Sequence, residues 1–309
     1  MAELTLRNKL AEILSRPNNP ELEMDFRATC SELQLNPSLY DPPIMQAYQD
    51  YLNAYQQKTS LYNFAYENKR TSLIIYNTET ETQEAKALQT PQELDKFTCI
   101  AQLPNGKLFC FGNNRLSRIT VLIDRNGGVE VLPSGTRCQQ SSCIYFNNSV
   151  YCFGGQDNKG LLTLSCRFDL DQNRWIKLTP MPQADLLCNS IMFNGNILIS
   201  GYIRRNLCLY STDIDSFSTI PYKFSNYRRK ILINSERLYL IECIKLGKIY
   251  ESEIGSYMDW TPIGNTSAIN CRPVQVYCSY NKGGIYFGIE EYQYYKFDLN
   301  EKRMIELKS

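Results

Sequence analysis

One absence limits the chemistry open to this chain: its 309 residues include twelve cysteines but no histidine. Without imidazole, Ser-His-Asp and Cys-His catalysis, histidine-containing zinc sites and imidazole-based copper and non-haem iron sites are excluded. A carboxylate pair, a lysine base or a single activated cysteine remains possible. A reactive thiol needs a nearby cation to lower its pKa. The sequence leaves this open for Cys138, which follows Arg137.

The spacing of the cysteines argues against a metal site. There is no C-x-x-C motif, and the closest pair, Cys138 and Cys143, has four residues between its members and no matching second pair. Most cysteines lie in strand-like apolar runs such as Phe109-Cys110-Phe111, where a thiol packs as a small hydrophobe. We therefore expect cysteines that pack in the core, with no metal and no cofactor.

The first residues do not resemble a targeting segment. The run MAELTLRNKLAEIL lacks an apolar core of seven residues and carries Glu3 and Glu12. No stretch approaches the 18 or more apolar residues that cross a bilayer. The expectation is a cytoplasmic protein with reduced thiols.

The charges nearly cancel, with 33 Lys plus Arg against 32 Asp plus Glu. The chain as a whole has no net field that would draw it onto nucleic acid or an acidic membrane, and neither is expected as a partner. A hydrophobic content of 43% supports a sizeable core.

A sequence repeat predicts the strands that position the cysteines and the charged side chains. The repeat is clearest between Ser142 and Pro182. Four strand-like segments, SCIYF, SVYCFGG, LSCRFDL and RWIKL, are separated by a turn at Asn147-Asn148, a polar loop and a second turn. An apolar run ending in Gly154-Gly155 is followed by Phe168 and then by Trp175 seven residues later. This pattern resembles one repeat of the kelch family, whose signature is a diglycine, an aromatic residue and a Trp at about this spacing.

The spacing of seven recurs along the chain. The paired positions are Tyr76 and Gln83, Ile123 and Glu130, Phe168 and Trp175, Tyr210 and Phe217, Tyr250 and Tyr257, and Phe297 and Met304. Successive first members lie 40 to 47 residues apart, which is the length of a propeller blade. Six blades are predicted, although the Tyr-rich alternation could also belong to an unrelated β-sandwich. The first unit shows three strands and the last shows four, which leaves open how the ring closes.

Residues 1–60 show a helical pattern instead. Leu6, Leu10, Ile13 and Leu14 form one apolar stripe, and a second stripe follows Pro42-Pro43. The predicted fold is therefore all-β, a six-bladed kelch-type β-propeller at residues 61–309 preceded by a short α-helical N-terminal segment at residues 1–60. Kelch proteins that act as ubiquitin-ligase adaptors carry a BTB or F-box module here. Sixty residues are too few for a BTB domain, and LAEILSRPNNPEL resembles an F-box only faintly.

In a propeller, the loops between second and third strands and those that link blades share one face. Here these loops are rich in basic residues, whereas the turns between third and fourth strands are acidic. Arginine forks beside tyrosines suit carboxylates and phosphates, and in the adaptor branch of the kelch family this face captures acidic peptides. The candidate binding residues are Arg115, Arg137, Lys159, Tyr202, Arg204, Arg205, Tyr227, Arg228, Arg229 and Arg272.

The sequence is consistent with three functions. The first is a non-catalytic scaffold or adaptor whose basic face binds an acidic or phosphorylated peptide of a protein partner. The second is the substrate-recognition subunit of a ubiquitin ligase. The third is a histidine-independent hydrolase or isomerase in the propeller channel. Copper oxidases of the galactose oxidase type share the kelch fold but need histidine ligands, which this chain lacks. Ordinary solvated loop charges would also explain the basic face.

Overall fold

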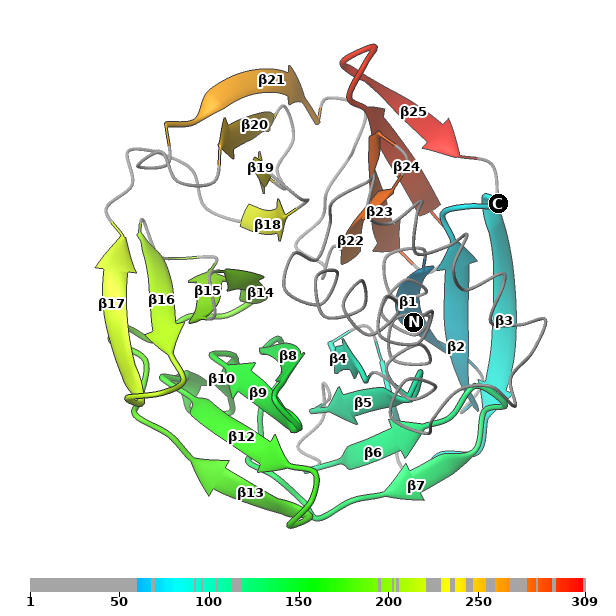
Figure 1. Ribbon diagram of the computed structural model, residues 1–309. Coiled ribbons are helices and arrows are strands. Elements are labelled where there is room, and N and C mark those ends of the chain that lie inside the picture. Colours follow the sequence, from blue (N-terminus) through cyan, green and yellow to red (C-terminus); the bar gives the residue numbers. More distant parts are fainter. Residues whose placement is uncertain are drawn as a thin grey trace, which may run out of the picture.

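The fold is a ring of small antiparallel sheets around a central channel, and every regular element within the described residues is a β-strand (Figure 1). The computed structural model describes residues 60–67, 70–91, 93–95, 97–103, 105–112, 118–193, 196–201, 203, 206–220, 229–233, 237–242, 247–253, 259–266, 277–281, 283–290 and 293–307. Six sheets form the blades, which confirms the predicted β-propeller. The predicted helical segment at residues 1–60 lies outside the described residues except for Ser60, the first residue of the first strand.

The blades follow one another along the chain. Blade 1 consists of β1 (Ser60–Glu67), β2 (Arg70–Asn77) and β3 (Thr82–Leu88). Blade 2 consists of β4 (Cys99–Gln102), β5 (Leu108–Phe111), β6 (Thr120–Ile123) and β7 (Val129–Val131). Blade 3 consists of β8 (Ser142–Phe146), β9 (Ser149–Phe153), β12 (Ser165–Asp169) and β13 (Arg174–Lys177), with the hairpin β10 (Gln156–Asp157) and β11 (Gly160–Leu161) inserted in it.

The second half of the ring repeats the four-stranded plan. Blade 4 consists of β14 (Asn189–Phe193), β15 (Asn196–Ser200), β16 (Leu207–Ser211) and β17 (Ser216–Ile220). Blade 5 consists of β18 (Arg229–Ile233), β19 (Arg237–Glu242), β20 (Lys248–Glu253) and β21 (Thr261–Asn265). Blade 6 consists of β22 (Tyr277–Asn281), β23 (Gly284–Glu290), β24 (Gln293–Asp298) and β25 (Arg303–Leu307).

Burial explains why these segments form strands in this order. All five residues of β9, the second strand of blade 3, are buried, because the neighbouring blades cover both faces of the sheet. The outermost strand β13 is exposed at both ends. Between blades 2 and 3 the core contains Phe109, Phe111 and Phe168, each almost fully buried. Burying a side chain of this size stabilises the fold by about 1.5 to 3 kcal/mol.

The spacing of seven corresponds to direct cross-strand pairs in four of the six units. The opposed residues are Tyr76 and Gln83, Phe168 and Trp175, Tyr210 and Phe217, and Phe297 and Met304. The register differs in the other two units. In blade 2, Ile123 lies opposite Val129, because the turn through Gly127 is one residue shorter. In blade 5, Tyr250 lies opposite Pro262 beside a β-bulge, and its predicted partner Tyr257 lies outside the described residues.

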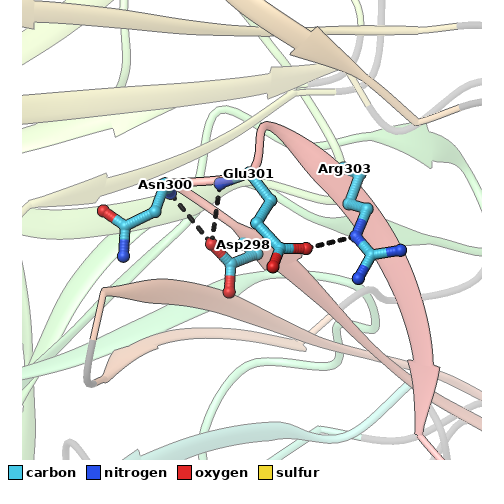
Figure 2. Close-up of polar contacts among 4 residues, drawn as sticks. All are labelled: Asp298, Asn300, Glu301 and Arg303. Atoms are coloured by element: carbon cyan, nitrogen blue, oxygen red, sulfur yellow. Dashed lines mark hydrogen bonds and ion pairs between the residues drawn. The ribbon is translucent and has the colours of Figure 1, made fainter.

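A second repeated feature is a capped turn, which in four blades directly follows the first member of the spacing-of-seven pair. Asp298, directly after Phe297, accepts hydrogen bonds from the backbone N–H groups of Asn300 at 2.9 Å and Glu301 at 3.0 Å (Figure 2). These bonds hold the pKa of the Asp298 carboxyl below its usual value. Figure 2 also shows Glu301 paired with Arg303 across the turn. The side-chain oxygens at the equivalent positions of three other blades cap their turns in the same way: Asn77, Asp124 and Asp169. Asp124, Asp169 and Asp298, three residues of the predicted acidic turns, therefore have a structural role.

Side-chain packing closes the ring within the described residues. Blade 1 has three strands there, and its inner strand β1 lies beside β22 and β23 of blade 6 (Figure 1). The rings of Tyr76 and Tyr294 stack with their centroids 4.1 Å apart and an interplanar angle of 17°. Leu61, Ala65, Ile74 and Tyr286 are the other buried residues of this cluster. The last blade holds all four of its own strands, as the sequence indicated.

Candidate functional site

A groove between blades 2 and 3 brings together several basic residues of the loop face. Its volume is about 540 Å³. The residues that line it are Arg118, Ser134, Gly135, Thr136, Arg137, Asp157, Asn158, Lys159 and Trp175. We call it the Trp175 groove. Arg118 precedes β6, residues 134–137 belong to the linker from β7 to β8, and Trp175 lies on β13.

The hairpin of β10 and β11 positions Lys159. Asp157 lies opposite Gly160, so Asn158 and Lys159 form a two-residue turn. The Asp157 carboxylate accepts a hydrogen bond from the Lys159 backbone N–H at 2.7 Å. Gly160 has a φ of 128°, a backbone conformation that side chains beyond glycine rarely adopt. The hairpin therefore presents the exposed Lys159 side chain in a defined place beside the groove.

The indole of Trp175 forms a rigid wall of the groove. Its ring packs against Phe111, with centroids 4.6 Å apart, and against Phe168, with centroids 5.3 Å apart. The indole N–H donates a hydrogen bond to the Pro133 carbonyl at 2.9 Å. This bond ties the linker to the ring.

Gly135 allows the linker to lie directly on this wall. A Cβ atom at Gly135 would come within 2.6 Å of Phe111 and 2.8 Å of Trp175, so no larger residue fits without a shift. The linker that carries Arg137 is therefore held in place by close packing against the indole.

The charges of the Trp175 groove are unequal. Arg118, Arg137 and Lys159 are exposed, whereas Asp157 is the single carboxylate among the described residues that line the groove. The structure shows no ion pair between any of these three cations and another described residue. Three cations against one carboxylate give the groove a local positive charge, although the whole chain is almost neutral.

The structure thus places two of the predicted binding residues, Arg137 and Lys159, in one groove. It adds Arg118, which lies in a basic loop of the same face. Arg229 is the first residue of β18 in blade 5, where its backbone lies opposite Glu242. The other predicted binding residues lie outside the described part of the chain: Arg115, Tyr202, Arg204, Arg205, Tyr227, Arg228 and Arg272.

Sequence reasoning treated Trp175 only as the Trp of the repeat and missed it as a wall of the groove. Ser134, Thr136 and Asn158 were also missed as lining residues. Their positions in the sequence could have indicated them, because Ser134 and Thr136 precede the predicted binding residue Arg137 in the linker and Asn158 precedes the predicted Lys159 in the inserted loop. Nothing in the local sequence indicates that the indole of an outer strand turns toward that linker.

A second cavity, of about 440 Å³, lies in the central channel. The inner strands of blades 1 to 5 line it, and its reactive side chains include Cys99, Cys143 and Lys230 on these strands and Cys188 directly before β14. Among the described residues that line this cavity there is no Asp or Glu, so these residues offer no carboxylate pair for general acid and base catalysis. Within the described residues, no group of three or more Cys, Asp or Glu is arranged to hold a metal ion.

No helix of the described residues has the length and apolar character needed to cross a membrane.

Comparison with known proteins identifies one repeat directly. Residues 137–182 match the family model of the kelch motif. This range begins at Arg137 and contains β8 to β13, so it covers blade 3 and most of one side of the Trp175 groove. No curated protein matches the chain.

Proposed function

Since this chain is a kelch-repeat β-propeller, we propose that it is a non-catalytic protein-interaction scaffold or adaptor whose Trp175 groove binds an acidic or phosphorylated peptide of a partner. Kelch propellers commonly act as protein-interaction scaffolds. The choice of this groove rests on one observation, the three cations that surround an indole wall without an ion pair among the described residues.

The chemistry of the groove suits an anionic peptide. The guanidinium groups of Arg118 and Arg137 can each form two parallel hydrogen bonds with a carboxylate or phosphate. Lys159 adds a point charge at the hairpin tip. The indole of Trp175 offers a rigid apolar surface for a neighbouring side chain of the peptide. A volume of about 540 Å³ lies within the range of typical ligand pockets.

The proposal can be tested by fluorescence, because the chain contains two tryptophans, Trp175 and Trp260. In a Trp260→Phe background, all indole emission comes from Trp175. Arrays of acidic and phosphorylated peptides would supply the ligands, and the best binder would be titrated against the purified protein. We expect a saturable change in Trp175 emission. The same peptide with Gln in place of Glu, or with unmodified Ser in place of phosphoserine, should produce none.

Charge reversal locates the binding site. Arg137→Glu and Lys159→Glu should each weaken binding about tenfold or more, which corresponds to about 1.4 kcal/mol. The matched control is Lys302→Glu, an identical change of charge in the turn of β24 and β25 at the other end of the blades. It should leave the affinity within about twofold. Equal effects of all three variants, or no effect of any, would show that the groove is not the site.

A further inference from the structure

Three cysteines lie in a row across blade 3. Cys143 on β8 is directly opposite Cys152 on β9, and Cys152 is directly opposite Cys166 on β12. Directly opposed residues of an antiparallel sheet project to the same face. All three thiols therefore point to one side of the sheet, where they pack in the core between blades 2 and 3.

A fourth thiol reaches this row from the neighbouring blade. Cys99 lies on β4, which runs beside β8, and its Sγ donates a hydrogen bond to the Ser141 carbonyl at 2.8 Å. The Sγ atoms of Cys143 and Cys152 are 3.2 Å apart. Burial raises the pKa of the Cys143 thiol, but hydrogen bonding with Cys152 and then the neighbouring Cys99 sulfur outweigh burial and lower this pKa to about 6. Burial and its neighbours raise the pKa of Cys152 well above the usual value.

The two cysteines of the close pair differ in accessibility. Cys143 is half-buried and lines the channel cavity of about 440 Å³, whereas Cys152 is fully buried beneath it. A small solute in the channel can therefore meet the Cys143 sulfur first. The Cys152 Sγ, 3.2 Å from the Cys143 Sγ, is within reach of a product formed there.

We propose that Cys143 and Cys152 form a redox-reactive thiol pair, in which a peroxide entering the channel oxidises Cys143 and Cys152 then closes a cross-strand disulfide. This is a modification site separate from the Trp175 groove. It does not depend on peptide binding.

The chemistry balances with the peroxide as the oxidant. The Cys143 thiolate attacks one peroxide oxygen, the O–O bond breaks, and Cys143 becomes a sulfenic acid while hydroxide leaves and takes up a proton to form water. The Cys152 sulfur then attacks the sulfur of the sulfenic acid. The S–O bond breaks, an S–S bond forms, and a second water carries away the Cys152 proton. In total, two thiols lose two electrons and two protons, and one hydrogen peroxide becomes two waters.

The backbone geometry permits this bond without rearrangement of the strands. Opposed residues of an antiparallel pair have Cα atoms about 4.5 to 5.5 Å apart, which lies within the range of about 4.4 to 6.8 Å found in disulfides. Cys143 and Cys152 are such a pair. Only the side chains need to rotate to bring Sγ atoms that are already 3.2 Å apart into bonding distance.

The test uses the full-length wild-type protein, so no variant has to fold. Samples exposed to hydrogen peroxide would be alkylated under denaturing conditions, digested without reduction and analysed by mass spectrometry. The expected product is a crosslinked peptide pair joining Cys143 and Cys152, lighter by two hydrogens and restored by a reductant. In the untreated native protein, iodoacetamide should alkylate Cys143 about tenfold or more faster than the buried Cys110 of blade 2.

Two variants separate the steps. Cys152→Ser should leave Cys143 as a sulfenic acid that a 1,3-dione reagent traps, and Cys143→Ser should abolish both the trapped product and the crosslink. A control, Cys208→Ser on β16 of blade 4, should form the crosslink as the wild type does. The proposal is wrong if peroxide joins other cysteines instead. It is equally wrong if Cys143 is alkylated no faster than Cys110, or if the wild type forms no crosslink.

Discussion

The ring of Tyr76 in blade 1 stacks on the ring of Tyr294 in blade 6, with centroids 4.1 Å apart. These residues are separated by most of the propeller sequence, and their contact joins its first and last blades. In the described part of the chain, no strand is shared between those blades, so side-chain packing carries the closure. A propeller closed in this way depends on that packing for the stability of both blades.

Tyr76→Ala should destabilise the protein strongly. The ring is fully buried, and loss of a buried aromatic side chain costs about 3 to 5 kcal/mol. Urea unfolding followed by circular dichroism would measure the change in the free energy of unfolding. Tyr66→Ala is the matched control, because Tyr66 is an exposed tyrosine on β1 of the same blade. A loss below about 1 kcal/mol for Tyr76→Ala would show that the stack does not hold the ring closed.

Tyr76→Phe, in contrast, should leave the free energy of unfolding unchanged or increase it. The Tyr76 hydroxyl is buried and has no hydrogen-bond partner among the described residues, and burial raises the pKa of this phenol above its usual value. Removing a buried unsatisfied polar group while keeping the ring relieves a desolvation cost of about 1 to 3 kcal/mol. The same urea experiment should show unchanged or increased stability. A clear loss would instead reveal a partner for this hydroxyl.

Asp215 makes the stability of blade 4 depend on pH. Its carboxylate accepts hydrogen bonds from the Tyr210 hydroxyl at 2.7 Å and from the Thr179 backbone N–H at 3.0 Å. Burial raises the pKa of Asp215, but the bonds from Tyr210 and Thr179 outweigh it and the pKa is lowered. The folded protein therefore binds this proton more weakly than the unfolded chain. This contribution is fully present above the unfolded pKa of about 3.9 and is lost as pH falls through the lower folded pKa.

Asp215→Asn should flatten that pH dependence. At neutral pH the loss should be about 1 to 2 kcal/mol, since hydrogen bonds to a charged acceptor are replaced by weaker ones at a partly solvated site. Thermal unfolding between about pH 3 and pH 7 would compare the variant with the wild type. The difference in stability should shrink toward the acid end. If it is constant across the range, ionisation of Asp215 does not contribute.

Gly135→Ala should disturb the wall of the Trp175 groove. The added methyl would meet Phe111 and Trp175 at less than 3 Å, and such overpacking costs about 1 to 3 kcal/mol. We expect Trp175 emission to shift to longer wavelength, because the linker moves away and water reaches the indole. Thr136→Ala, at the exposed next position, should leave both the emission and the stability unchanged. An unshifted spectrum in Gly135→Ala would mean that the linker adapts without moving from the ring.

Binding of an acidic peptide in the Trp175 groove should depend on salt. Raising the ionic strength from about 0.1 M to about 1 M shortens the Debye length from about 10 Å to about 3 Å, which screens exposed charges. The affinity measured by Trp175 fluorescence should therefore fall. The double variant Arg137→Gln and Lys159→Gln should bind more weakly and respond less to salt. An affinity that does not change with salt would point to apolar contacts with the indole as the main source of binding.

Some features of the site were implied by local sequence. The two-residue turn predicted at Asn147-Asn148 is present, with both residues at positive φ. Such a turn by itself places Cys143 opposite Cys152, so the thiol pair could have been read from the hairpin. The spacing of seven predicted the pair of Phe168 and Trp175 for the same local reason. It failed at Ile123, where the turn is one residue shorter, and at Tyr250, where a bulge and a longer connection change the register.

The sequence alone determined the strands, most turns and the number of blades, because alternation, turn residues and repeat length act within a few residues or one repeat. It also indicated that Arg137 and Lys159 belong to the same face, since alternating strands send their loops to alternate ends. Only the tertiary structure decided that Trp175 lies beside them and that Cys99 joins the thiols of blade 3. Those arrangements depend on how neighbouring blades pack against each other. Packing brings together residues that are far apart in the chain, and the sequence around each of them does not show which distant residue it will contact.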